Sequence, residues 1–217
     1  MPFASSPGEV PPERVALADP TLPVDPEHAA RLLGEALRRR HDEPPTDSRG
    51  DPGRGPSWPL SRLAEHVHAR AAQTAEKPAA TIRVTMPEGP YLGRPVEQLA
   101  VALVEMVAAL PQAEETDGVE TEVAITLGLS LEACFVEPSG GVVVDRPGPA
   151  PQAWGDRHVD LAAAAVGLNQ RFGPAVVVPM IDAYGFDAVD ARRLDTAQLL
   201  VALADVVGWP SSDDEAS

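Results

Sequence analysis

The side chains best suited to chemistry are one histidine and three aspartates in the last third of the chain: His158, Asp160, Asp182 and Asp187. The first two open a predicted helix, and the other two follow an apolar segment at 175–178 that we interpret as a short strand. Carboxylates with one imidazole suit Mg²⁺ or Mn²⁺. Their spacing matches no established metal motif, and helix capping explains aspartates such as Asp187 better. A small metal-assisted enzyme is therefore an alternative hypothesis.

Other catalytic patterns are missing from the sequence. It contains no GxxxxGK[ST], GxGxxG or GxSxG segment. His66 and His68 are two positions apart on a predicted helix, so they point away from each other and do not chelate one metal. Cys134 lies in an apolar strand, where a lone cysteine is usually a small buried hydrophobe. We therefore predict no catalytic residue and no cofactor.

Acidic residues outnumber basic residues in the chain. It has 33 acidic and 17 basic residues, a formal net charge of -16, and Lys77 is its only lysine. Such a charge repels phosphate backbones and anionic membranes, so neither is expected as a partner through direct charge attraction. An acidic DNA-mimic inhibitor is a third hypothesis, and it requires the acidic residues to line one elongated face.

Targeting signals are not apparent. The first residues contain no basic n-region followed by an apolar segment, and no apolar run approaches the ~20 residues that span a bilayer. The single cysteine excludes an intrachain disulfide and suits a reducing compartment. We expect a soluble, cytoplasmic protein.

The N-terminal region is rich in proline, since the first 60 residues contain 12 of the 24 prolines. Residues 1–57 are predicted to form a partly disordered arm and linker with one amphipathic helix at about 26–40. Asp25 suits its N-cap. An apolar stripe on this helix either packs on the domain or docks into a groove of a partner. The stripe consists of Leu32, Leu33, Ala36 and Leu37.

Residues 58–209 are predicted to form one α+β domain, followed by a disordered acidic tail at 210–217. Helical spacing is found at 58–74, 95–110 and 156–171, and a last helix, capped at Asp195, ends at Gly208. Strands are expected at 81–86, 123–135, 142–144 and 175–178, with a hairpin turn at 138–141 and a loop at 145–153. Hairpins mixed with helices favour a mixed, largely antiparallel sheet packed by helices.

The functional hypothesis combines the missing catalytic patterns with the tethered helix. It is a non-catalytic protein-interaction module of the adaptor, chaperone-like, regulatory or immunity type. Its partner would be another protein, bound through the apolar stripe at 32–37.

Overall fold

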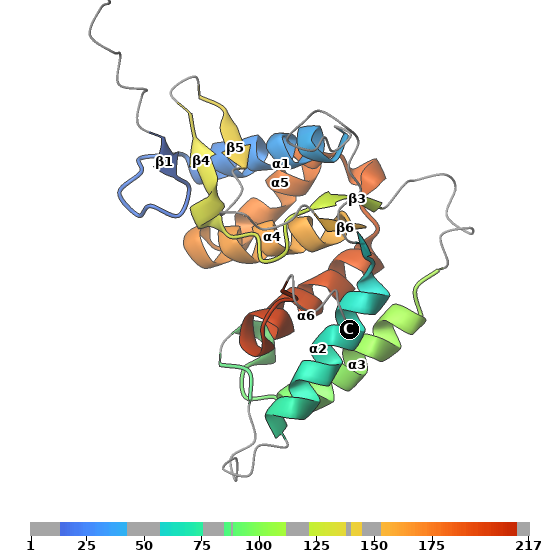
Figure 1. The fold of residues 1–217 in the computed structure, drawn as a ribbon. Helices are drawn as coiled ribbons and strands as arrows, with labels where there is room; N and C mark the ends of the chain where they lie inside the picture. Colours follow the sequence, from blue (N-terminus) through green and yellow to red (C-terminus); the bar gives the residue numbers. More distant parts are fainter. Residues whose placement is uncertain are drawn as a thin grey trace, which may run out of the picture.

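The computed structural model describes residues 14–42, 57–75, 85–87, 89–111, 122–137, 140–144 and 153–211. Helices and short strands alternate along these residues, which confirms the predicted α+β class (Figure 1). In chain order the elements are β1 (Val15–Ala16), α1 (Pro26–Asp42), β2 (Ser57–Trp58), α2 (Leu60–Ala75), η1 (Gly89–Tyr91), α3 (Val96–Ala108), β3 (Glu122–Ile125), η3 (Leu131–Ala133), β4 (Cys134–Val136), β5 (Val142–Val144), β6 (Ala153–Asp156), α4 (His158–Phe172), η4 (Pro174–Val176), α5 (Val177–Tyr184), η5 (Phe186–Ala188) and α6 (Ala191–Val207).

The strands form two small three-stranded sheets. One has the order β1-β4-β5 and is antiparallel throughout, and its β4–β5 pair is the predicted hairpin, with Cys134 opposite Val144. The other has the order β2-β6-β3, in which β6 pairs parallel with β2 and antiparallel with β3. The predicted mixed, largely antiparallel pairing is confirmed. Strand β6 begins at Ala153, the last residue of the predicted loop at 145–153.

Helix α4 lies at the centre of the fold. Nine of its residues are buried, including the run from His158 to Ala165. Alanines fill four positions of that run, so neighbouring elements approach the helix closely. On one side it packs against α1 and α5, and on the other against α6, which in turn contacts the adjacent pair α2 and α3 (Figure 1).

Helix α1 belongs to the core rather than to a free arm. Leu33 and Leu37 are completely buried, Ala36 is 7% exposed, and Leu32 is half-buried against the same core. The helix packs along α5, and Arg31 donates a 2.8 Å hydrogen bond to Asp182 of α5. The stripe proposed to dock a partner is therefore occupied by the chain itself. The boundary expected at residue 58 does not separate α1 from the domain.

The segment expected as a strand at 175–178 is helical. Gly173, with φ of 88°, ends α4, and Pro174 starts the 3₁₀ turn η4 that leads into α5. Pro179 lies in the first turn of α5, where its missing N–H removes no helical hydrogen bond. Met180, Ile181 and Tyr184 are buried at helical spacing. The β-branched valines suggested a strand, but the spacing beyond them is that of a helix.

Helix α6 begins earlier than expected. Asp190 is its N-cap, and its carboxylate accepts hydrogen bonds from the backbone N–H groups of Arg192 and Arg193. Asp195, which the sequence analysis assigns as the cap, lies inside the helix. The predicted end at Gly208 is confirmed, since this residue has φ of 102° and donates its N–H to Ala204.

Some expectations fall outside the described residues. These are the arm before residue 14, the linker between 43 and 56, most of the strand at 81–86 and the tail after residue 211. Of that strand, Thr85 pairs with Pro95 and Met86 is buried. Within the described part, no helix combines the length and the apolar character that crossing a membrane requires.

Candidate functional site

The four residues of the metal hypothesis are not brought together. His158 and Asp160 are buried at the start of α4, whereas Asp182 and Asp187 are exposed on α5 and η5. Asp182 pairs with Arg31 on the surface. No group of three His, Cys, Asp or Glu side chains in the described part of the chain is placed to hold a metal ion. The alternative hypothesis of a metal-assisted enzyme thus lacks the convergence of these residues that it requires.

Asp160 instead belongs to a buried network that joins α4 to α1, α5 and β3. Its carboxylate accepts hydrogen bonds from the backbone N–H of Thr126, at 2.9 Å, and from His41 Nε2, at 3.2 Å. His41 Nδ1 lies 2.8 Å from the Tyr184 hydroxyl, to which Arg157 also donates. The Tyr184 oxygen accepts a hydrogen bond from Arg157, so the hydrogen of the hydroxyl group can point at His41 Nδ1. The imidazole then donates its hydrogen bond from Nε2 to Asp160. Burial raises the pKa of Tyr184, which keeps this hydroxyl protonated.

His158 is held by a second network at the start of α6. Its Nδ1 lies 2.5 Å from Asp156 Oδ1, and its Nε2 accepts the backbone N–H of Asp190 at 2.9 Å. An Nε2 that accepts this bond carries no proton, so His158 is a neutral imidazole that donates through Nδ1. Arg193 donates to the other Asp156 oxygen at 2.8 Å. The role of His158 is to connect two helices, and it has no free nitrogen for a metal.

This network predicts a loss of stability in acid. Burial acts to raise the pKa of Asp156, but the hydrogen bonds from His158 and Arg193 outweigh it and hold the pKa below its usual 3.8. A lowered folded-state pKa stabilises the protein above about pH 4, and this contribution is lost as the pH falls through the folded-state value. We expect Asp156→Asn to lower the free energy of unfolding by about 2 kcal/mol at neutral pH. It should also flatten the dependence on pH below about pH 5.

The measurement is urea unfolding from pH 7 down to pH 3. Asp182→Asn, which alters an exposed pair, is the matched control and should leave both the stability and its pH profile close to those of the original chain. A pH profile of Asp156→Asn that is parallel to the original would contradict the assignment.

Cys134 is a core residue. Burial, chiefly, raises the pKa of its thiol to about 12, so the reactive thiolate is scarcely populated at neutral pH. The interpretation of this cysteine as a small buried hydrophobe agrees with its complete burial in β4.

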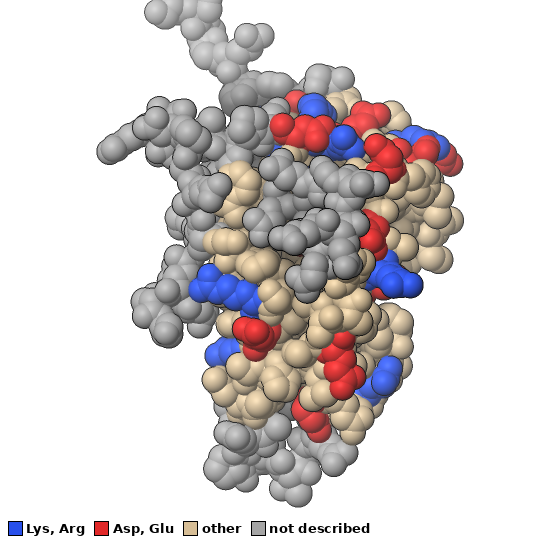
Figure 2. All heavy atoms as spheres, turned by 90° about the vertical axis from the view of Figure 1, so that its right-hand side faces the viewer, with Lys and Arg blue, Asp and Glu red and all other residues tan. Residues whose placement is uncertain are grey.

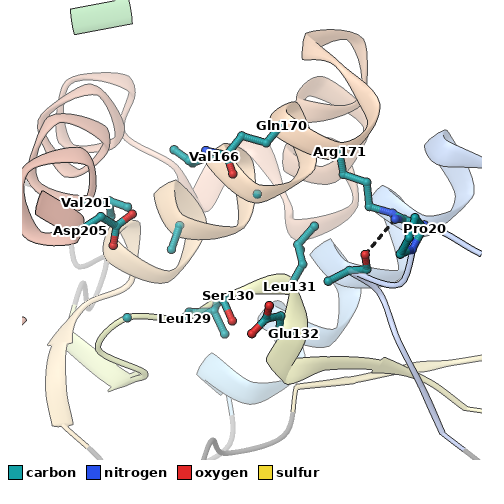
Figure 3. Close-up of a pocket in the computed structure, with 14 residues that line it drawn as sticks. Pro20, Leu129, Ser130, Leu131, Glu132, Val166, Gln170, Arg171, Val201 and Asp205 are labelled. Carbon is teal, nitrogen blue, oxygen red and sulfur yellow. Dashed lines mark hydrogen bonds between the residues drawn. The ribbon is translucent and has the colours of Figure 1, made fainter. Parts of the chain in front are cut away.

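A cavity of about 590 Å³ lies between the loop at 128–132, α4 and α6 (Figure 3). Ser130 and Glu132 line it from the loop, Gln170 from α4 and Asp205 from α6 (Figure 3). Arg171 closes one end, since its guanidinium donates to the carbonyl oxygens of residues 18 and 19 at 3.0 and 2.5 Å. The cavity therefore presents two carboxylates, a hydroxyl and an amide, with the Arg171 guanidinium at one end.

Gly128 and Trp209 fix the wall of this cavity. Gly128 has φ of 71°, which glycine adopts readily, and a Cβ there would lie 3.4 Å from the Trp209 ring. The Trp209 indole donates to Asp205 Oδ1 at 2.9 Å. The loop and the end of α6 are thus held together on the side from which Asp205 lines the cavity.

A second cavity of about 460 Å³ adjoins the first, because Val166, Gln170 and Asp205 line both. Its other walls come from η1 and the residues before it, from η4 and α5, and from α6. Tyr91 of η1 is half-buried there, and burial together with the negative charge of Asp195 raises its pKa. Its hydroxyl is therefore protonated at neutral pH and can donate a hydrogen bond. We call the two cavities together the α4–α6 cleft.

Sequence reasoning did not identify this cleft. Its polar residues come from segments far apart in the chain, namely Glu132 from η3, Gln170 from α4 and Asp205 from α6. Each one taken alone is an ordinary exposed polar residue. The loop that lines the cavity lies within the segment predicted as one strand at 123–135, which the structure divides into β3, η3 and the start of β4.

No family model matches the sequence, and no curated protein matches it either. Solved structures do match the fold, and aminoglycoside phosphotransferases are among them. The enzyme APH(3'')-Id of Streptomyces rimosus matches with a TM-score of 0.57 and 18% identity, over 84% of this chain and 62% of that one. An aminoglycoside-3'-phosphotransferase of type VIII matches with a TM-score of 0.56 and 17% identity, over 82% of this chain and 61% of its own.

The Streptomyces enzyme in complex with ADP and streptomycin matches similarly, with a TM-score of 0.54 and 19% identity, over 81% of this chain and 62% of that one. The chain thus shares the fold of these phosphotransferases, and the match spans about three fifths of their length.

This likeness overturns the prediction of a non-catalytic protein-interaction module, because the proteins that share the fold are phosphotransferase enzymes. The positive argument for that prediction also fails, since the stripe at 32–37 is packed inside the chain. Nor is the third hypothesis, a DNA mimic, supported by the face in Figure 2, where acidic and basic side chains are interspersed among uncharged ones.

Proposed function

We propose that this chain is a phosphotransferase-type protein whose α4–α6 cleft binds a hydroxylated, cationic small molecule of the amino-sugar class. The observation that carries the proposal is the pair of carboxylates, Glu132 and Asp205, which line one cavity from two different elements. Carboxylates bind ammonium groups through charge-assisted hydrogen bonds, and the hydroxyl of Ser130 and the amide of Gln170 suit sugar hydroxyls. The neighbours in fold are named for aminoglycosides, which supports the same class of ligand.

The charge of the whole chain favours such a ligand. A net charge of -16 attracts cations to the molecule and raises their rate of encounter. The size also fits, because cavities of about 590 and 460 Å³ lie in the range of small-molecule sites. We retain the prediction of a cytoplasmic location, since the single cysteine suits a reducing compartment.

The nucleotide side of the reaction is a separate matter. One structural neighbour is named as a complex with ADP, and phosphotransferases generally hold the phosphates through metal ions. The described residues do not fit a metal site, since they place no three metal-ligating side chains together. The sequence also has no H-x-D-x-x-x-x-N segment, the spacing that protein kinases use for their base and a Mg²⁺ ligand. The proposal therefore concerns the binding of the acceptor molecule.

Streptomycin binding by the full chain, measured by isothermal titration calorimetry, is the test. We expect Asp205→Asn to weaken binding by about three- to tenfold, because one partly exposed charge-assisted hydrogen bond is lost. Glu35→Gln, which removes an equal charge from an exposed position on α1, is the matched control and should change little. Added salt should weaken binding to the original chain.

Two results would overturn the proposal: no measurable binding, or equal effects of the Asp205 and Glu35 variants. A parallel ³¹P NMR experiment with ATP and Mg²⁺ tests transfer itself. A phosphorylated product would extend the proposal from binding to catalysis.

A further inference from the structure

We infer that the ligand of the α4–α6 cleft is amphipathic, with an apolar group that fills the cavity beside Tyr91 and a cationic, hydroxylated group in the neighbouring cavity. This inference rests on the proposed function and specifies the class of ligand. It starts from a difference between the two cavities. The cavity at the loop 128–132 has both carboxylates, whereas the cavity beside Tyr91 has mainly apolar walls.

Proline contributes much of the apolar wall of the second cavity. Proline rings contribute at three positions, Pro87, Pro90 and Pro174, and these residues lose little entropy when a ligand makes contact. Met86, Val177 and Val206 add further apolar surface, and the Tyr91 ring provides an aromatic wall. Such walls favour an apolar or aromatic group, because its apolar surface is removed from water when it binds there.

Because the two cavities are connected, a single ligand can occupy both. Val166, Gln170 and Asp205 line both cavities, so they mark the place where a molecule passes from one to the other. An ammonium group bound to Asp205 would have hydroxyl-binding groups on one side and apolar walls on the other. A fully polar cation would leave the apolar walls in contact with water and would gain nothing from them.

The polar groups around the second cavity restrict its ligand further. Asn169, Gln170 and Gln198 offer amides, and Tyr91 offers a hydroxyl that stays protonated. These four are neutral donors and acceptors, suited to an ether, amide or phenol on the apolar group. The charged group of this cavity, Asp205, lies where it meets the first cavity, so the positive charge of the expected ligand lies at that junction or in the first cavity.

The experiment compares two probes that differ by one apolar group, glucosamine and benzyl 2-amino-2-deoxyglucopyranoside. Both are titrated into the isotope-labelled full chain and followed by NMR, which measures weak affinities. We expect the benzyl compound to bind at least about tenfold more tightly, because the ring is buried against the walls beside Tyr91.

Two variants test where the additional affinity of the benzyl compound arises. Ala202→Phe fills the second cavity from α6 and should remove the advantage of the benzyl compound, while the affinity for glucosamine stays within about twofold. Tyr91→Ala removes the aromatic wall and should reduce the advantage several-fold, so the test does not depend on one variant that folds poorly. Circular dichroism of each variant verifies the fold.

Each outcome separates the two proposals. If both probes bind equally and Ala202→Phe changes neither affinity, the amphipathic ligand is excluded while the cationic site stands. If the benzyl compound binds more tightly but keeps its advantage in both variants, the apolar group lies elsewhere and the inference is wrong. If neither probe binds, the proposed function falls and the inference falls with it.

Discussion

Replacing Gly34 by alanine should lower the free energy of unfolding by about 3 kcal/mol, although alanine is the better helix former by ~1 kcal/mol. A Cβ at Gly34 would lie 2.2 Å from the carbonyl oxygen of Met180 and 3.1 Å from the backbone nitrogen of Tyr184. These are backbone atoms of α5, so no side chain can rotate away. Helices α1 and α5, which pack along each other, would have to separate.

Urea unfolding followed by circular dichroism measures this loss. Gly167→Ala is a matched control in α4, because there the new Cβ would lie 2.8 Å from the Cγ atom of Leu131, the side chain of which can shift. We expect that control to cost about 1 kcal/mol or less. Glu35→Ala, at an exposed position beside Gly34, should change the stability by less than about 0.5 kcal/mol. A Gly34→Ala protein as stable as the original would show that α1 does not approach α5 so closely.

Replacing Asp160 by alanine should cost about 4 kcal/mol of folding stability. The change leaves two buried donors without an acceptor, the backbone N–H of Thr126 and the imidazole of His41. Water cannot compensate, because both side chains of the His41–Asp160 pair have no exposed surface. Asp160→Asn keeps one acceptor oxygen and should cost less.

A double-mutant cycle with His41→Ala isolates the interaction between the two side chains. The double variant should lose less stability than the sum of the single variants, because each single change already breaks the same hydrogen bond. Strictly additive losses would contradict a direct interaction between His41 and Asp160.

The sequence predicts the elements that repeat a local period. The β4–β5 hairpin follows from two apolar runs around a turn, and the end of α6 follows from Gly208. The class of fold was correct for the same reason, since it depends on the kinds of element present and their order. Helix α1 was correctly placed in the sequence, but the sequence does not say what its apolar stripe contacts.

Where prediction failed, contacts distant in sequence decide the outcome. The valines at 176–178 have a strong preference for strands, yet α1, α4 and η4 pack around α5 and favour a helix. The α4–α6 cleft could not be predicted, because it depends on the positions of η3, α4 and α6 in space. The hypothesis of a non-catalytic module failed for a related reason: the fold is shared at 18% identity, and this sequence displays none of the catalytic motifs sought in it.

The packing of α1 has a consequence for how the protein is made. Its partners in the chain come much later, since His41 contacts Tyr184 across 143 positions and Arg31 contacts Asp182 across 151. A ribosome that adds roughly 5–20 residues per second needs about 7–30 s to pass from the helix to those partners. Throughout that interval the face of α1 that packs along α5 has no native partner. The native packing of α1 is therefore completed only after α5 has been made.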